Sequence, residues 1–242
     1  MKKVISIAIM FFAMTQVWSQ SNVISRIPLL GESAPSFIAE STTGTLDFPA
    51  DFGSKWKILF SHPADFTPVC TSELMELAKM QQDFKDLNVR LAVISPDDLE
   101  MHKMWVNSME DMIHKENAQV EIKFPLIDDS KLKIGWQYGM LTGSPDSWHA
   151  VRGVFIIDPQ NKIRSIVFYP PNVGRNMVEI KRTVIALQTA DKNTVLTPAN
   201  WNPGDDVLLP YPKNYKDYSS NEINKNDVYS KSGYMIYKKL ND

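Results

Sequence analysis

The sequence predicts an α/β fold in which helices flank a central mixed sheet and a small extension follows at the C-terminus. Apolar runs of strand length alternate with stretches whose apolar residues repeat at helical spacing, and a hairpin and one further helix complete the series. After Asp191 the composition changes to a stretch rich in proline and asparagine, and then to a tyrosine-rich end. This change predicts the boundary between the main domain and the extension.

The elements of the main domain can be placed in order along the chain. Strands are predicted at residues 56–61, 89–95, 153–157 and 162–168, and the last two form a hairpin across Asp-Pro-Gln-Asn. Helices are predicted at residues 69–87, 96–115 and 175–189. This order fits a thioredoxin-like α/β sandwich.

Cys70 is the only cysteine in the chain, so it cannot form an internal disulfide. Thr67 and Pro68 predict a helix start, because threonine caps helices and proline lacks only an N–H that would be unpaired there. In that register Cys70 lies in the first turn, where unpaired N–H groups and the helix dipole favour a thiolate. The sequence therefore predicts an activated nucleophile. The alternative is a buried structural cysteine, since free cysteines are often buried.

The residues around Cys70 resemble the active-site signature of the peroxiredoxin family. Pro63-x-x-x-Thr67-x-x-Cys70 matches that signature, and the longer string that begins at His62 is similar to that of the one-cysteine, peroxiredoxin 6-like subgroup. Three later segments match the subgroup in the expected order; they are residues 152–158, 169–176 and 197–205. The resemblance runs from about residue 28 to about residue 210.

The resemblance implies a thiol-dependent peroxidase that reduces hydrogen peroxide and organic hydroperoxides in antioxidant defence and redox homeostasis. Cys70 would be the nucleophile and would become a sulfenic acid. Thr67 would orient the peroxide, Arg152 would stabilise the thiolate and the charge that develops on oxygen, and Pro63 would shield the sulfur from water.

Three more residues are implied around these four. Glu73 and Arg175 would hold the residues that contact the peroxide in place, Arg175 through an ion pair. His62 matches a subgroup histidine that contacts the peroxide or its reductant. No second cysteine can resolve the sulfenic acid, so an external thiol or a thioredoxin- or glutaredoxin-like protein has to supply electrons. The chemistry requires no cofactor.

One departure from the subgroup concerns a lipase-like Gly-x-Ser-x-Gly segment that some of its members carry before the active-site strand. Here Lys55 stands at the serine position and Lys57 replaces the final glycine. Ser54 is displaced by one residue and lacks the pattern of a nucleophile elbow. We therefore carry over no phospholipase activity.

The N-terminus has the pattern of a secretory signal peptide. Two lysines precede an apolar run at residues 4–14, which is short for a transmembrane helix. Val17 and Ser19 suit a cleavage site before Gln20. We therefore expect residues 1–19 to be removed and the protein to be periplasmic or secreted, with no stable membrane insertion. The alternative is a hydrophobic leader or anchor that stays attached.

Residues 28–190 are expected to form the main domain and residues 191–242 the C-terminal extension of the one-cysteine subgroup. Six of the eight tyrosines lie in the last 32 residues, at positions 211, 215, 218, 229, 234 and 237. Tyrosine combines an apolar ring with a polar tip, which suits a protein interface. The resemblance implies that the extension packs on a partner subunit, and we expect a homodimer.

Net charge and histidine spacing argue against nucleic acid binding and against a metal site. The net charge is −2 with no basic face, which argues against nucleic acid. The four histidines, at positions 62, 102, 114 and 149, have no ligand spacing, so no metal site is predicted. Asp97-Asp98 and Asp128-Asp129 are interpreted as a helix start and a turn.

Two alternative functions remain open from the sequence. In a cysteine hydrolase, Cys70 and His62 would form an acyl-enzyme with esters and consume no peroxide. A thioredoxin-like redox sensor or holdase would be oxidised once by peroxide without turnover. Peroxide consumption with excess thiol separates these functions from a peroxidase.

Overall fold

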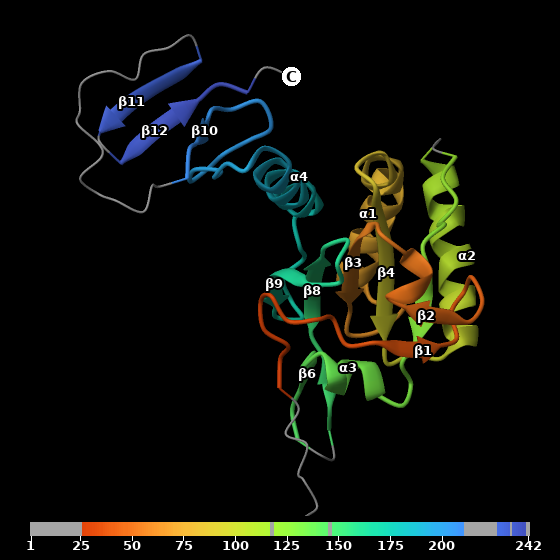
Figure 1. Ribbon diagram of the computed structural model, residues 1–242. Coiled ribbons are helices and arrows are strands. Elements are labelled where there is room, and N and C mark those ends of the chain that lie inside the picture. Colours follow the sequence, from red (N-terminus) through yellow and green to blue (C-terminus); the bar gives the residue numbers. More distant parts are fainter. Residues whose placement is uncertain (1–25, 117–118, 145–146, 211–226, 233, 241–242) are drawn as a thin grey trace, which may run out of the picture.

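A five-stranded mixed sheet forms the centre of the molecule (Figure 1). The computed structural model describes residues 26–116, 119–144, 147–210, 227–232 and 234–240. The strand order is β5-β4-β3-β8-β9. The bounds are β3 (Trp56–Ser61), β4 (Val89–Ser95), β5 (Leu126–Asp128), β8 (Arg152–Ile157) and β9 (Ile163–Tyr169). β3, β4 and β5 are parallel, whereas β8 pairs antiparallel with β3 and with β9.

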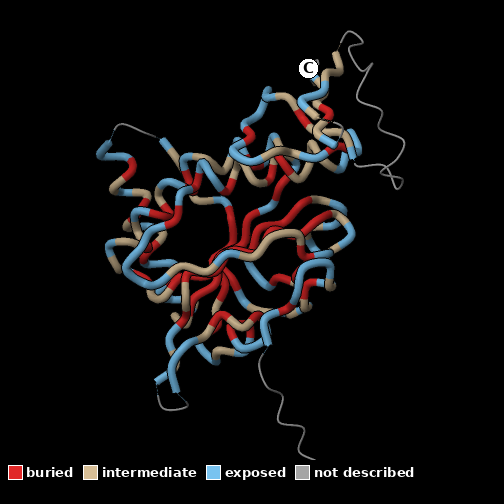
Figure 2. Tube along the Cα trace, turned by 90° about the vertical axis from the view of Figure 1, so that its left-hand side faces the viewer, coloured by how far each residue is buried: buried red, intermediate tan, exposed pale blue. Residues whose placement is uncertain are grey.

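Each face of this sheet has its own apolar core, because successive strand residues point to opposite sides. Ile58 and Phe60 of β3 pack under the long helices, whereas Leu59 faces the other way. The long helices are α1 (Pro68–Asp86), α2 (Leu99–Lys115) and α4 (Met177–Asn193). Figure 2 shows the buried strands running through the middle of the molecule.

Shorter elements cover the second face of the sheet. They are β1 (Phe37–Ala39), β2 (Leu46–Phe48), η1 (Ala50–Phe52), α3 (Lys133–Gln137), β6 (Leu141–Thr142) and β7 (His149–Ala150). Phe48 of β2 is fully buried against the sheet, as are Tyr138 and Met140, which lie between α3 and β6. The sequence did not predict these elements, because two or three residues carry too little periodicity to distinguish a strand from a loop.

The predicted long elements are confirmed, with shifts at two helix starts. Asp98 caps α2 by accepting a hydrogen bond from the Met101 N–H at 2.9 Å, so the helix begins at Leu99. Asn176 caps α4 in the same way and moves its start to Met177. The prediction that this helix begins at Arg175 is therefore wrong. Arg175 lies in the preceding loop, where its side chain can turn into the interior.

Beyond α4 the chain forms a separate three-stranded antiparallel sheet (Figure 1). Its order is β10 (Val207–Leu208), β12 (Met235–Lys238) and β11 (Val228–Ser232). Trp201 and Val207 are buried and cluster with Ala186 of α4, which attaches this part to the main domain.

The extension uses some of its tyrosines within its own sheet. Tyr229 stacks on Tyr237 with ring centroids 5.2 Å apart, and its hydroxyl donates to Asp206 Oδ2 at 2.7 Å. Tyr234 is 64% exposed. The other three tyrosines of this region and the predicted signal peptide lie outside the described residues. Within the described residues, no helix has the length and apolar character needed to cross a membrane.

Candidate active site

Cys70 lies in the first turn of α1, as the sequence predicted. β3 ends at Ser61, and a short loop leads to Thr67, whose extended backbone occupies the N-cap position with Pro68 as the first helical residue. This strand–loop–helix arrangement places Cys70 on the buried side of the first turn of α1, where it is fully buried. A peroxide must therefore enter the fold to meet the sulfur.

Thr67 occupies the cap position without using its side chain as a cap. Its hydroxyl donates a hydrogen bond to the carbonyl oxygen of Ala64 at 2.9 Å and accepts none from the helix. Thr67 is therefore the N-cap residue, as predicted, but the expectation that its side chain caps the helix is wrong. The bond to Ala64 uses the hydroxyl hydrogen and leaves the oxygen lone pairs to accept a hydrogen bond from a ligand.

Arg152 is the charged partner of Cys70. Its Nη1 atom lies 3.2 Å from Cys70 Sγ and 2.8 Å from Glu73 Oε2. The Pro171 carbonyl oxygen accepts from Nη2 at 2.6 Å and from Nε at 3.0 Å, so the guanidinium is held on two sides. Arg152 opens β8, whose pairing with β3 brings it next to α1.

Glu73, one helical turn after Cys70, joins Arg152 to Arg175. Its Oε2 accepts from Arg175 Nη2 at 2.7 Å, and its Oε1 accepts from the Arg175 backbone N–H and from Nε. Arg175 Nη1 donates to the carbonyl oxygens of Ser61 and Gly153. Burial would raise the pKa of Glu73, but the hydrogen bonds and charge of Arg175, with the charge of Arg152, bring it below its usual value.

The three charges of this cluster do not cancel. Arg152, Arg175 and Glu73 are all buried, and their formal charges sum to one positive charge. Arginine does not release its proton at any ordinary pH, so the surplus persists. A Cys70 thiolate beside Arg152 would bring the cluster to neutrality, whereas a neutral thiol would leave a buried positive charge uncompensated. The cluster therefore presents a surplus positive charge to Cys70 Sγ.

His62 and Pro63 begin the loop between β3 and α1. His62 is fully buried, and its Nε2 atom bonds to Asp65 Oδ1 at 2.8 Å. Its Nδ1 atom has no hydrogen-bond partner among the described residues. Pro63 is half-buried. The structure thus pairs Cys70 with Arg152 and does not assemble the Cys70–His62 pair that a hydrolase needs.

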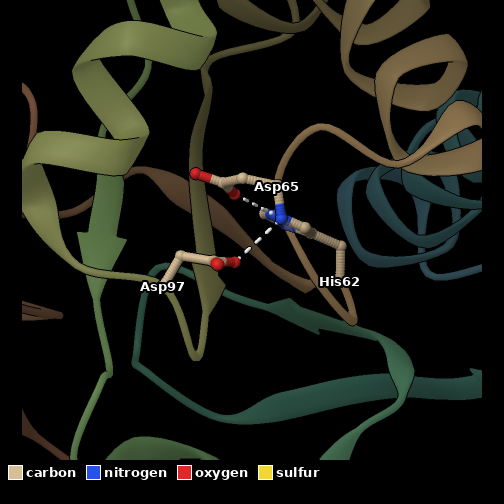
Figure 3. A group of neighbouring side chains, drawn as sticks. All are labelled: His62, Asp65 and Asp97. Carbon is tan, nitrogen blue, oxygen red and sulfur yellow. Dashed lines mark hydrogen bonds and ion pairs between the residues drawn. The ribbon is translucent and has the colours of Figure 1, made fainter.

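A second polar cluster surrounds His62, and the sequence did not reveal it. The His62, Asp65 and Asp97 ligand atoms lie within 4.8 Å of one another (Figure 3), and His102 of α2 also bonds to Asp65. Asp97 Oδ2 accepts from the Asp65 N–H and from Ser95 Oγ. These atoms already bond to one another, so we interpret the group as a hydrogen-bond network and assign no metal to it.

The signals for this network were present but ambiguous. The histidines were interpreted as scattered, yet β3 and α2 bring His62 and His102 onto one carboxylate. The i,i+3 spacing of His62 and Asp65 in a loop could have suggested a contact. The partner on α2 could not be found without the crossover geometry.

The lysines that replace the lipase-like pattern have structural roles. Lys57 is buried within β3, and its Nζ atom donates to Asn161 Oδ1 at 2.5 Å. Lys55 Nζ donates to Asn88 Oδ1 at 2.9 Å. Both lysines, which flank the first residue of β3, therefore bond to asparagine side chains.

Comparison with known proteins agrees with this geometry. Residues 30–166 match the AhpC/TSA family, and residues 186–221 match the C-terminal domain of 1-Cys peroxiredoxin. This chain is a one-cysteine peroxiredoxin. A peroxiredoxin of Methanosarcina mazei is 50% identical over 187 residues, which make up 77% of this chain and 85% of the relative. A mitochondrial peroxiredoxin of Saccharomyces cerevisiae is 41% identical over 187 residues, or 75% of this chain and 70% of the relative.

Two solved peroxiredoxin structures share the fold. A yeast mitochondrial 1-Cys peroxiredoxin matches with a TM-score of 0.76 at 35% identity, covering 88% of this chain and 100% of that one. Peroxiredoxin 6 of Arenicola marina matches with a TM-score of 0.75 at 34% identity, covering 88% of this chain and 98% of that one. The peroxiredoxin described here is therefore a thiol-dependent peroxidase with the thioredoxin-like fold.

Proposed function

We propose that Cys70 reduces peroxide as a thiolate whose charge is balanced by Arg152. The observation that carries this proposal is the 3.2 Å contact between Arg152 Nη1 and Cys70 Sγ within a cluster of net positive charge. The thiolate attacks one peroxide oxygen, so an S–O bond forms as the O–O bond breaks. Two electrons pass from sulfur to oxygen, Cys70 becomes a sulfenic acid, and the leaving hydroxide takes a proton to become water.

The neighbouring side chains have distinct proposed roles. Thr67 Oγ1 accepts a hydrogen bond from the peroxide, and the Arg152 guanidinium stabilises the negative charge that spreads onto oxygen. Glu73 and Arg175 hold Arg152 in place. Pro63, in the loop before the cysteine, limits access of water to the sulfur. His62, in the same loop, contacts the bound peroxide.

The reductant is proposed to be an external thiol. The chain has one cysteine, so a thiol has to attack the sulfenic acid from outside, forming a mixed disulfide and releasing water; a second thiol then frees Cys70. The solved yeast relative is described as resolved through glutathione and thioredoxin systems. Because Cys70 is fully buried here, the structure around the sulfur has to open before any thiol reaches it. We therefore propose that a small thiol, which needs a smaller opening, reacts faster than a bulky protein thiol.

Turnover with chosen thiols tests these assignments. We expect the full-length protein to consume many equivalents of hydrogen peroxide with excess glutathione or dithiothreitol, and Cys70→Ser to consume none while keeping the native circular dichroism spectrum. Consumption of a single equivalent by the wild type despite abundant thiol would instead indicate a peroxide sensor. Peroxide consumption by Cys70→Ser would remove Cys70 from the mechanism.

We also propose that the protein is exported and acts as a homodimer. The lysine start and apolar run at residues 4–14 support export, and the tyrosines of the extension support an interface. Mass spectrometry of the protein from its native host should find an N-terminus at or near Gln20, and light scattering should find a dimer at micromolar concentration. An intact Met1 would contradict export, and a monomer would contradict the dimer.

A further inference from the structure

Asp65 lies between two buried histidines. Its Oδ1 atom is 2.8 Å from His62 Nε2, and its Oδ2 atom is 2.7 Å from His102 Nδ1. The three side chains are at most 1% exposed. Burial would raise the pKa of Asp65, but the bonds from His102 and His62 bring it below its usual value, so the carboxylate is ionised. An ionised carboxylate only accepts hydrogen bonds, so both contacting ring nitrogens carry hydrogens.

Both ring nitrogens of His102 face hydrogen-bond acceptors. Its second nitrogen, Nε2, lies 3.1 Å from the carbonyl oxygen of Ile127, which is also an acceptor. Burial would lower the pKa of His102, but the bond and charge of Asp65 raise it above its usual value. Asp97 and Asp128 also interact electrostatically with this ring. His102 and Asp65 therefore form a buried ion pair.

His62 is neutral and has a defined tautomer. Burial lowers the pKa of His62, so its second nitrogen does not gain a proton, and Asp65 requires the one hydrogen on Nε2. Nδ1 is then a bare acceptor, and it is buried without a hydrogen-bond partner among the described residues. Buried polar atoms without partners are rare, and each such exception calls for an explanation.

His62 adjoins the charged cluster of Cys70 through the preceding residue, Ser61. The backbone N–H of His62 donates a hydrogen bond to the Ile94 carbonyl oxygen at 3.1 Å. The centroid of the His62 ring lies 5.0 Å from that of the Trp105 ring. The preceding residue, Ser61, gives its carbonyl oxygen to Arg175, and the charge of Arg175 acts on the His62 ring. The network around His62 therefore adjoins the charged cluster of Cys70.

We propose that Asp65 and His102 are positioning residues for peroxide reduction: their ion pair fixes His62 as the Nε2–H tautomer and leaves Nδ1 to accept a hydrogen bond from bound peroxide. Neither residue touches the reacting atoms. Without the carboxylate, His62 has no reason to prefer Nε2–H, and the hydrogen can move to Nδ1, where it would block the acceptor. The inference rests on the proposed contact between His62 and peroxide.

The tautomer can be read directly in the full-length wild-type protein. Histidine ¹⁵N–¹H correlation spectra distinguish protonated from bare ring nitrogens. We expect His62 to show a bare Nδ1 and a protonated Nε2, and His102 to show two protonated nitrogens at neutral pH. A protonated Nδ1 on His62, or a neutral His102, would overturn the proposal without any variant.

Stopped-flow rates of Cys70 oxidation test the functional part. Asp65→Asn and His102→Gln should each slow oxidation roughly 10- to 100-fold, the range seen when the orienting partner of a metal-bound histidine is removed. His114→Gln, at the exposed end of the same helix, is the matched control and should leave the rate unchanged. In a His62→Gln background, Asp65→Asn and His102→Gln should cause no further loss, because both act through His62.

The outcomes separate this inference from the proposed role of His62. If His62→Gln leaves the rate unchanged, the peroxide contact of His62 is wrong. If His62→Gln slows oxidation but Asp65→Asn and His102→Gln do not, or if their effects add to that of His62→Gln, the positioning proposal is wrong. Should Asp65→Asn not fold, His102→Gln and the wild-type tautomer decide the question.

Discussion

Two buried polar clusters meet at the end of β3, and each is built around one carboxylate. Glu73 joins Arg152 to Arg175, and Asp65 joins His62 to His102. The first cluster carries one surplus positive charge. In the second cluster a protonated His102 balances the charge of Asp65. The first cluster can therefore bind an anion. The second cluster can only orient the His62 ring and accept a hydrogen bond at its Nδ1 atom.

The clusters also differ in how they respond to the loss of their carboxylate. Arginine keeps its proton in the interior, so Arg152 and Arg175 without Glu73 would remain two unpaired buried cations. His102 can lose its proton when its counter-ion is removed, which relieves the cost of burial. A permanent charge suits the stabilisation of a thiolate, and a titratable ring suits the control of a hydrogen position.

The largest expected effect on stability comes from removing the carboxylate between the arginines. Glu73→Gln should lower the free energy of unfolding by about 3–5 kcal/mol, the cost of breaking a buried ion pair. Asp65→Asn at neutral pH should cost less, because His102 becomes neutral. Urea unfolding of both variants measures the difference. Equal losses would show that the two clusters respond alike.

Thr67→Val should have the next largest effect, and it should act on the rate rather than on stability. Removing a hydrogen-bonding group from the site should slow oxidation of Cys70 by about 10²–10³. Thr67→Ser keeps the hydroxyl and serves as the control, with a rate near that of the wild type. Stopped-flow oxidation of the reduced proteins gives the comparison. A normal rate in Thr67→Val would make the threonine purely structural.

The pH dependence of stability should separate the clusters further. The pKa values of Glu73 and Asp65 lie below their usual values, so both contributions are present at neutral pH and are lost as the pH falls through the lowered values. The pKa of His102 is raised above 6.5, so its contribution is complete below 6.5 and is lost as the pH rises through the raised value. Only the cluster of Asp65, His62 and His102, the histidine cluster, should therefore lose its contribution to stability both at acid pH and at high pH.

Urea unfolding at a series of pH values checks this expectation. Relative to the wild type, His102→Gln should lose most stability in mildly acidic solution and progressively less as the pH rises. A difference between the two proteins that does not change with pH would mean that folding does not raise the pKa of His102.

The smallest expected effect on peroxide chemistry comes from the C-terminal extension. Truncation after Leu196 removes Trp201 and Val207, which pack on α4 away from both clusters. We expect the dimer to weaken and the preference among thiols to change, whereas oxidation of Cys70 by hydrogen peroxide stays within about tenfold. Light scattering and stopped-flow rates measure the two effects. A larger loss of rate would make the extension part of the peroxide site.

The sequence predicted the arginine cluster better than the histidine cluster, and the reason is physical. Strand, loop and helix signals around Cys70 are local, and the family signature names Arg152, Glu73 and Arg175. The position of Cys70 in the first turn follows from Thr67-Pro68.

The histidine cluster depends on how α2 packs against the sheet, so the contact between Asp65 and His102 spans 37 residues that local patterns cannot relate. The short strands of the second sheet face and the hydrogen bond of Thr67 to Ala64 were also missed. Each of these depends on a neighbour that only the assembled fold supplies.

Arg152 is proposed to balance the charge of the Cys70 thiolate and to stabilise the reaction with peroxide. The most direct test is the second-order rate of Cys70 oxidation by hydrogen peroxide in Arg152→Ala, with Arg90→Ala on the exposed side of β4 as the control. We expect Arg152→Ala to be slower by about 10²–10³ and Arg90→Ala to match the wild type. A change of less than about threefold in Arg152→Ala would contradict the claim.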